Sequence, residues 1–153
     1  MKYSIDTSAL LDAWVRYYPP DVFPSVWEKI ERITNNGTLI ATEEVLMELG
    51  KKHDEVYKWA RDHGGMFVPV DGQIQVEVAR ILARHERLVD TRRERSSADP
   101  FVIALAKLES CAVVTAEKAT GKPEKPNIPD VCSALGIRCM DLIEMFREQG
   151  WRV

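Results

Sequence analysis

The segment that most constrains the fold is a carboxylate and a proline followed by an almost entirely apolar stretch of helical length, residues 99–106. Proline suits the first turn of a helix, so Asp99 is expected near the N-terminus of this helix. A helix that is apolar on all sides must be buried, and its N-terminus is then held inside the protein. Asp99 therefore either caps the helix, for which Asp is well suited, or is a fixed carboxylate of a functional site.

Short apolar segments alternate with amphipathic helical segments along the rest of the chain. The expected strands are residues 2–6, 39–41, 66–70, 112–115 and 137–140. In the first helix, Leu10, Leu11, Trp14 and Val15 are expected on the buried face, and Ser25 is expected to cap the second helix. This alternation predicts an α/β fold, a three-layer α/β/α sandwich with a central, mostly parallel sheet. At 153 residues, the chain is expected to form one domain over residues 1–153.

Composition narrows the classes of function. The net charge is -3 at pH 7, so the chain as a whole is not a basic nucleic-acid-binding protein. It has no apolar leader and no apolar run long enough to cross a membrane, and we therefore expect a cytoplasmic protein with no membrane partner. A zinc site or a cysteine nucleophile is not expected, because the cysteines form no CxxC pair and the histidines are scattered (Cys111, Cys132, Cys139; His53, His63, His85).

Two local stretches are nevertheless basic. The first spans residues 84–95 and contains Arg84, Arg87, Arg92, Arg93 and Arg95, and the second contains Lys118, Lys122 and Lys125. Such stretches are usually solvated surface. Since these two flank acidic positions, they also suit a substrate that carries phosphates.

The acidic positions follow the expected strands. The carboxyl ends of parallel strands meet at one edge of the sheet, which would gather Asp6, Glu44 and Glu117 there. Glu48 lies one helical turn beyond Glu44, and Asp99 reaches the edge if its helix runs in the right direction. Clustered carboxylates need a neutralising cation, and Mg²⁺ or Mn²⁺ prefers such ligands. Each residue also has a structural explanation as a helix cap, a first-turn acid or a solvated side chain.

At four places the sequence resembles the PIN-domain nucleases. Residues 3–10 (YSIDTSAL) look like their opening motif, residues 43–49 (EEVLMEL) their second, residues 97–106 (SADPFVIALA) their third, and residues 113–117 (VVTAE) their fourth. The resemblance implies a PIN-like fold and a Mg²⁺- or Mn²⁺-dependent endoribonuclease, with Asp6, Glu48 and Asp99 as metal ligands. It also implies RNA as the substrate, a homodimer and, for a toxin, an antitoxin protein as partner.

The fourth motif departs from the family pattern. Glu117 stands where the family usually has an aspartate, so its role is auxiliary, and Asp130 or Glu44 is a reserve acidic position. Two alternatives remain open. One is a catalytically silent module that binds RNA or protein. The other is a phosphatase that forms an aspartyl-phosphate on Asp6, although Ser8 stands where such a site has its second Asp.

Overall fold

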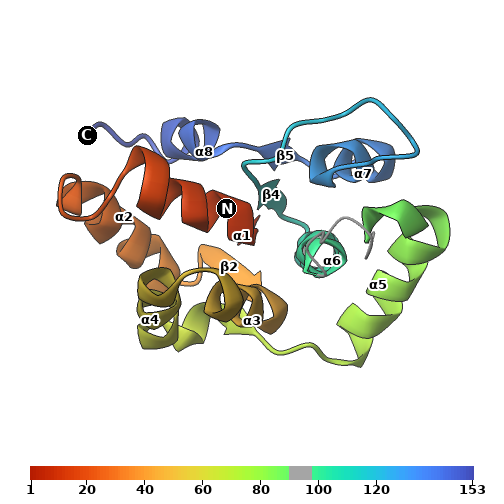
Figure 1. The fold of residues 1–153 in the computed structure, drawn as a ribbon, viewed down its shortest axis with the longest axis horizontal. Coiled ribbons are helices and arrows are strands. Elements are labelled where there is room, and N and C mark those ends of the chain that lie inside the picture. Colours follow the sequence, from red (N-terminus) through yellow and green to blue (C-terminus); the bar gives the residue numbers. More distant parts are fainter. Residues whose placement is uncertain (90–97) are drawn as a thin grey trace.

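The computed structural model describes residues 1–89 and 98–153, and a five-stranded parallel sheet lies at its centre (Figure 1). The strand order is β3-β2-β1-β4-β5, and every neighbouring pair is parallel. The strands are β1 (Tyr3–Ile5), β2 (Leu39–Thr42), β3 (Phe67–Val68), β4 (Ala112–Val114) and β5 (Cys139–Met140). Since all five run the same way, the residues that follow β1, β2, β4 and β5 lie at one edge, as predicted.

Helices cover both faces of this sheet, which confirms the predicted three-layer α/β/α architecture. On one face lie α5 (Gly72–Arg84), α6 (Asp99–Glu109) and α7 (Ile128–Leu135); on the other lie α1 (Thr7–Leu11), α2 (Pro24–Asn35) and α8 (Leu142–Glu148) (Figure 1). The central helix is α6, which packs on β1, β2 and β4. Its residues from Asp99 to Ala106 are buried apart from the half-buried Phe101, as expected for a helix without a polar face.

The remaining elements complete the connections. Helices α3 (Glu43–Lys52) and α4 (Asp54–Asp62) link β2 to β3, the short turns η2 (Gly64–Met66) and η3 (Glu86–Leu88) follow α4 and α5, and η1 (Asp12–Tyr17) continues α1. No helix in the described part of the chain is both long and apolar enough to cross a membrane.

Two local expectations are wrong. Val15 is 58% exposed, whereas Ala13 is buried, because α1 passes directly into the π-helical turn η1. The wider i→i+5 spacing of a π-helix shifts the face that later residues present. Ser25 is not a cap, since α2 begins at Pro24 and Phe23 is its N-cap residue. Proline at the first helical position already fixes the backbone there.

Candidate functional site

Asp6 is the centre of the candidate site, and it follows β1 directly. Its side chain is buried, with 2% of its surface exposed. One carboxylate oxygen, Oδ1, accepts a hydrogen bond from the backbone N–H of Ala9 at 2.9 Å, so Asp6 caps α1. The hydroxyl of Ser8 lies 2.8 Å from both carboxylate oxygens, and Thr115, which follows β4, donates to Oδ2 at 2.6 Å. The carboxylate is thus held by groups from two strand ends.

Burial sets the protonation of Asp6. Removal from water raises its pKa from 3.8 to about 7, and the nearby charge of Glu117 raises it too. Hydrogen bonds from Thr115, Ala9 and Ser8 favour the charged form but do not offset the burial. A carboxyl group with this pKa is half protonated near neutral pH, and a bound cation would favour its charged form.

Glu117 lies close to Asp6 but is held from the other side. Its Oε1 accepts the backbone N–H of Ile128, the first residue of α7, at 2.9 Å. Its own N–H donates to the hydroxyl of Thr115, which also bonds Asp6. Next to it, the N–H of Ala116 donates to Ser8 Oγ at 3.1 Å. Two hydroxyl groups therefore connect the segment after β4 to Asp6.

Helix α6 directs Asp99 toward the same edge. The helix ends just before β4, at the start of the parallel strands, so it runs antiparallel to them. Ser4 Oγ in β1 donates to the carbonyl of Val102 at 2.8 Å, which fixes the level of the helix against the strand. From this contact, Asp99 lies about 4.5 Å along the helix axis and Asp6 about 7 Å along the strand, both toward the carboxyl edge.

The side chain of Asp99 is buried at this position, with 4% of the residue exposed. Asp99 is the first residue of α6, and the N-cap residue is Ala98, whose side chain makes no capping hydrogen bond. Asp99 is therefore not the N-cap residue of α6.

The two glutamates of α3 lie at different depths. Glu44 is half-buried in the first turn. The Glu48 side chain is 10% exposed, and Lys52 Nζ lies 3.4 Å from its Oε1 in an i,i+4 ion pair. Their neighbour Glu43 accepts the backbone N–H of Val70 at 2.9 Å and so anchors the segment that follows β3. Of the three, Glu48 combines near-complete burial with a charged partner.

Asp130 is engaged in holding a loop. Its carboxylate accepts the backbone N–H groups of Thr120, Gly121 and Asn127 and the hydroxyl of Thr120. Burial would raise its pKa, but these hydrogen bonds outweigh it and hold the pKa below the ordinary 3.8. The connection between β4 and α7 is therefore fastened to the first turn of α7. This role was not apparent from the sequence, although the Asn127 and Asp130 spacing is that of a capping box.

Two buried hydroxyl groups without partners, those of Thr7 and Thr42, lie at the same edge of the sheet. Among the described residues, three buried side-chain oxygens accept or donate no hydrogen bond, namely Oγ1 of Thr7, Thr34 and Thr42. Thr7 follows Asp6, and Thr42 ends β2 beside β1. Native proteins rarely leave such atoms unsatisfied without a bound water or ion. Among all the residues that the structure describes, no three His, Cys, Asp or Glu side chains are arranged to hold a metal ion as they stand.

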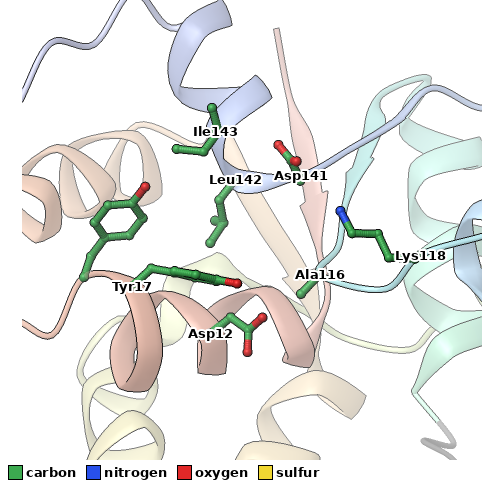
Figure 2. Close-up of a pocket in the computed structure, with 8 residues that line it drawn as sticks. Asp12, Tyr17, Ala116, Lys118, Asp141, Leu142 and Ile143 are labelled. Atoms are coloured by element: carbon green, nitrogen blue, oxygen red, sulfur yellow. The ribbon is translucent and has the colours of Figure 1, made fainter.

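A pocket of about 290 Å³ opens between η1, the segment that follows β4 and the start of α8 (Figure 2). Asp12 borders it from η1, Ala116 and Lys118 from the segment after β4, and Asp141 from the N-cap of α8. Ala116 belongs both to the pocket wall and to the hydrogen-bond network of Asp6. A ligand in this pocket would therefore lie against Ala116, whose N–H bonds Ser8 beside Asp6, with the ammonium group of Lys118 near it.

The two basic stretches meet in space. Arg84 and Arg87, at the end of α5 and in η3, border one cavity together with Lys122 from the β4–α7 connection. Arg92, Arg93 and Arg95 lie outside the described residues.

The cysteines show one arrangement that the sequence did not predict. Cys132 in α7 and Cys139 in β5 are neighbours, and the proximity of Cys139 together with burial raises the pKa of Cys132. Burial also raises the pKa of Cys111, to about 11. Neither Cys111 nor Cys132 is therefore a thiolate at neutral pH.

Comparison with known proteins identifies a family and a fold. No curated protein matches the chain. Among solved structures, the chain is similar to one described as VapBC2 from Rickettsia felis bound to a DNA fragment from their promoter, with a TM-score of 0.56 and 13% identity. The match covers 92% of this chain and 98% of that one, and it shows a shared fold. A family model described as "Domain of unknown function (DUF4411)" matches residues 3–153, and the chain belongs to that family.

Proposed function

We propose that this protein is a metal-dependent endoribonuclease with its active site at the carboxyl edge of the sheet. The observation that carries the proposal is the buried carboxylate of Asp6, whose pKa is raised to about 7 beside Glu117. Perturbed carboxyl groups in a cleft are typical of functional sites. The proposal also rests on the PIN-like motifs of the sequence and on the direction of α6, which places Asp99 at the same edge of the sheet as Asp6.

The donor set suits a hard divalent cation. Asp6, Glu48 and Asp99 are the proposed ligands, with Glu117 as an auxiliary one and Glu44 in reserve, and all are oxygen donors of the kind that Mg²⁺ and Mn²⁺ prefer. The unsatisfied hydroxyls of Thr7 and Thr42 are further oxygen atoms at this edge. Bound there, Mg²⁺ or Mn²⁺ would lower the pKa of the attacking water and offset the charge of the phosphodiester.

The residues of the chain have distinct tasks in this proposal. Ser8 and Thr115 donate to the oxygens of Asp6 and fix their direction, as hydrogen-bonded neighbours of metal ligands do. The N–H of Ile128 does the same for Glu117. Lys118, at the pocket next to Ala116, pairs with a phosphate of the RNA. We call the proposed ligands Asp6, Glu48, Asp99 and Glu117 the carboxylate cluster. Asp130 has the weakest case as a ligand, because its oxygens already accept hydrogen bonds from the β4–α7 connection.

The proposal also includes a biological role as the toxin of a toxin–antitoxin pair. The fold is shared with the Rickettsia felis structure described as VapBC2, and the sequence resembles PIN-domain nucleases, many of which are toxins. We accordingly propose a homodimer with an antitoxin protein as partner, acting on cellular RNA.

The test compares two substitutions that preserve shape. Asp6→Asn and Asp99→Asn each keep the size of the side chain and one acceptor oxygen but remove the negative charge. We expect both variants to fold and to lose Mn²⁺-dependent cleavage of single-stranded RNA by at least about 100-fold, roughly 3 kcal/mol of transition-state stabilisation. Asp62→Asn, an exposed residue at the end of α4, is the matched control and should cleave like the wild type.

The outcomes separate the alternatives. Cleavage that survives in both well-folded variants would contradict the nuclease proposal. Wild-type protein that binds RNA but cleaves none at any Mn²⁺ concentration would indicate the silent binding module. Formation of a phosphate-analogue adduct on Asp6 would indicate the phosphatase.

A further inference from the structure

A second cavity, of about 530 Å³, is bordered by α7, by the β4–α7 connection and by the end of α5 with η3. We call it the basic groove, and its cationic side chains are Arg84, Arg87 and Lys122. In Figure 1 the β4–α7 connection passes over α7 toward the C-terminal end of α5, which brings together segments about 35 residues apart. We propose that the basic groove binds the phosphate chain of single-stranded RNA that leads away from the candidate active site.

The charges of the basic groove are available to a ligand. Arg84, Arg87 and Lys122 are exposed, and none of them forms an ion pair with any residue that the structure describes. Two carboxylates also border the groove: Glu86 is exposed, and Asp130 is occupied by N–H and O–H groups. Among the described residues, three cations without an ion-pair partner beside one solvated carboxylate leave a local positive excess in a protein of net charge -3.

Hydrogen bonds fix the part of the groove that carries Lys122. Asp130 holds the N–H groups of Thr120 and Gly121, the two residues before Lys122, at 2.9–3.1 Å. The hydroxyl oxygen of Thr120 in turn accepts the N–H of Lys122 and lies 2.8 Å from the carbonyl oxygen of Lys125. One carboxylate in α7 thus fixes the turn that presents Lys122 to Arg84 and Arg87. Asp130 is a positioning residue in this proposal.

The short distance between the groove and the proposed active site favours RNA over other polyanions as the ligand. Glu117 of the carboxylate cluster and Lys122 of the groove are five residues apart on the same connection, so their Cα atoms lie within about 18 Å of each other. A single strand that places a phosphodiester at the cluster therefore reaches the groove with its next few phosphates. This step rests on the proposed function, whereas the positive groove itself does not.

Salt dependence of binding tests the proposal directly. Each phosphate contact on a single strand contributes about 0.7 to the slope of log K against log salt concentration. Binding is measured with a fluorescent single-stranded RNA in EDTA, where no cleavage occurs. The triple variant Arg84→Gln/Arg87→Gln/Lys122→Gln should reduce the magnitude of that slope by about 2. The control triple Lys29→Gln/Lys58→Gln/Arg147→Gln makes the same change in net charge on α2, α4 and α8 and should keep the wild-type slope.

A second measurement addresses Asp130. Asp130→Asn should lower the slope by about 0.7, the contribution of one contact, and adding Lys122→Gln should lower it no further, because both changes remove the same contact. A merely structural role of Asp130 would weaken folding without this non-additive effect on the salt slope.

Each result decides one of the proposals. An unchanged slope in the groove triple, or an equal fall in the control triple, would overturn the basic groove. Binding of polyglutamate as tight as binding of RNA with the same number of charges would overturn the assignment to RNA. If the groove triple loses its slope but wild-type protein with Mn²⁺ cleaves no RNA, the groove stands and the nuclease proposal fails.

Discussion

At the scale of single residues, Asp6 couples protonation to folding. Its pKa is about 7 in the folded protein and 3.8 in the unfolded chain, so the folded state binds the proton more tightly. The contribution of Asp6 to the free energy of unfolding is therefore complete below about pH 4 and is lost as the pH rises toward 7. A shift of this size corresponds to about 4 kcal/mol.

Replacing Asp6 with Asn should remove this loss. The amide oxygen can still accept the N–H of Ala9, and the amide NH₂ can donate to the hydroxyls of Ser8 and Thr115, which rotate to accept. In EDTA, we expect Asp6→Asn to be more stable than the wild type at pH 8 and to differ little from it at pH 4. Urea unfolding at pH 4, 6 and 8 measures this, with Asp62→Asn as control. A difference that stays constant across this range would contradict the predicted titration.

Asp6 and Asp99 show which roles of a single carboxylate can be predicted from the sequence and which cannot. The sequence placed Asp6 at the end of a strand, and the structure confirms that the residue caps α1; its role as a metal ligand stays a prediction. For Asp99 the sequence left capping open, and the structure makes Ala98 the N-cap residue. That distinction depends on one residue of helix register, which local sequence does not determine.

At the scale of elements, Glu77 joins α5 to α6. Its carboxylate, whose side chain is 5% exposed, lies 3.2 Å from both Lys107 Nζ in α6 and Arg80 Nη1 in α5. Burial would raise its pKa, but these two cations outweigh that effect and lower it. Glu77 therefore contributes stability above its ordinary pKa of 4.5, and that contribution is lost as the pH falls through the lower folded value.

Glu77→Gln should therefore destabilise the protein at pH 7 by about 1–3 kcal/mol, the usual range for hydrogen bonds to charged groups. Exposure of Arg80 and Lys107 places the effect toward the lower end. Denaturant unfolding at pH 7 and pH 3 measures the change, which should shrink at pH 3. Glu86→Gln, an exposed residue of η3, serves as the control. Equal destabilisation by both substitutions would show that the ion pairs of Glu77 are not responsible.

Elements whose pattern depends on local chemistry were predictable, and those set by tertiary context were not. The strand positions, the buried face of α2 and the Asp141 cap of α8 follow from alternation and capping preferences and are confirmed. The π-helical turn after α1 was not predicted, because nothing in residues 12–17 departs from an ordinary helical pattern. The Glu77 ion pairs were also missed, since the sequence separates Glu77 from Lys107 by 30 residues.

At the scale of the whole molecule, the arrangement of charge matters more than its sum. The net charge of -3 suggests no affinity for nucleic acid, yet the chain gathers carboxylates at the sheet edge and cations in the basic groove. The parallel direction of the strands could be predicted from the sequence, and therefore also the position of Asp6 and Glu117 at one edge of the sheet. The meeting of Arg84 with Lys122 could not, because it depends on how α5 lies against α7.

Metal binding should appear as a change in the stability of the entire fold. A ligand that binds only the folded state stabilises it by RT ln(1 + [L]/Kd), about 2.7 kcal/mol when the ion is present at 100 times its Kd. For a protein of this length, that corresponds to a rise in Tm of about 5–10 °C. We expect Mn²⁺ to raise the Tm by such an amount relative to EDTA, and to do so much less in Asp6→Asn and Asp99→Asn. Asp130→Asn starts from a lower Tm, because the β4–α7 connection is released, but should keep the full Mn²⁺-dependent rise, since Asp130 holds that loop and not the ion. The same rise in wild type and Asp6→Asn would mean that the ion binds elsewhere, and loss of the rise in Asp130→Asn would return that residue to the ligand set.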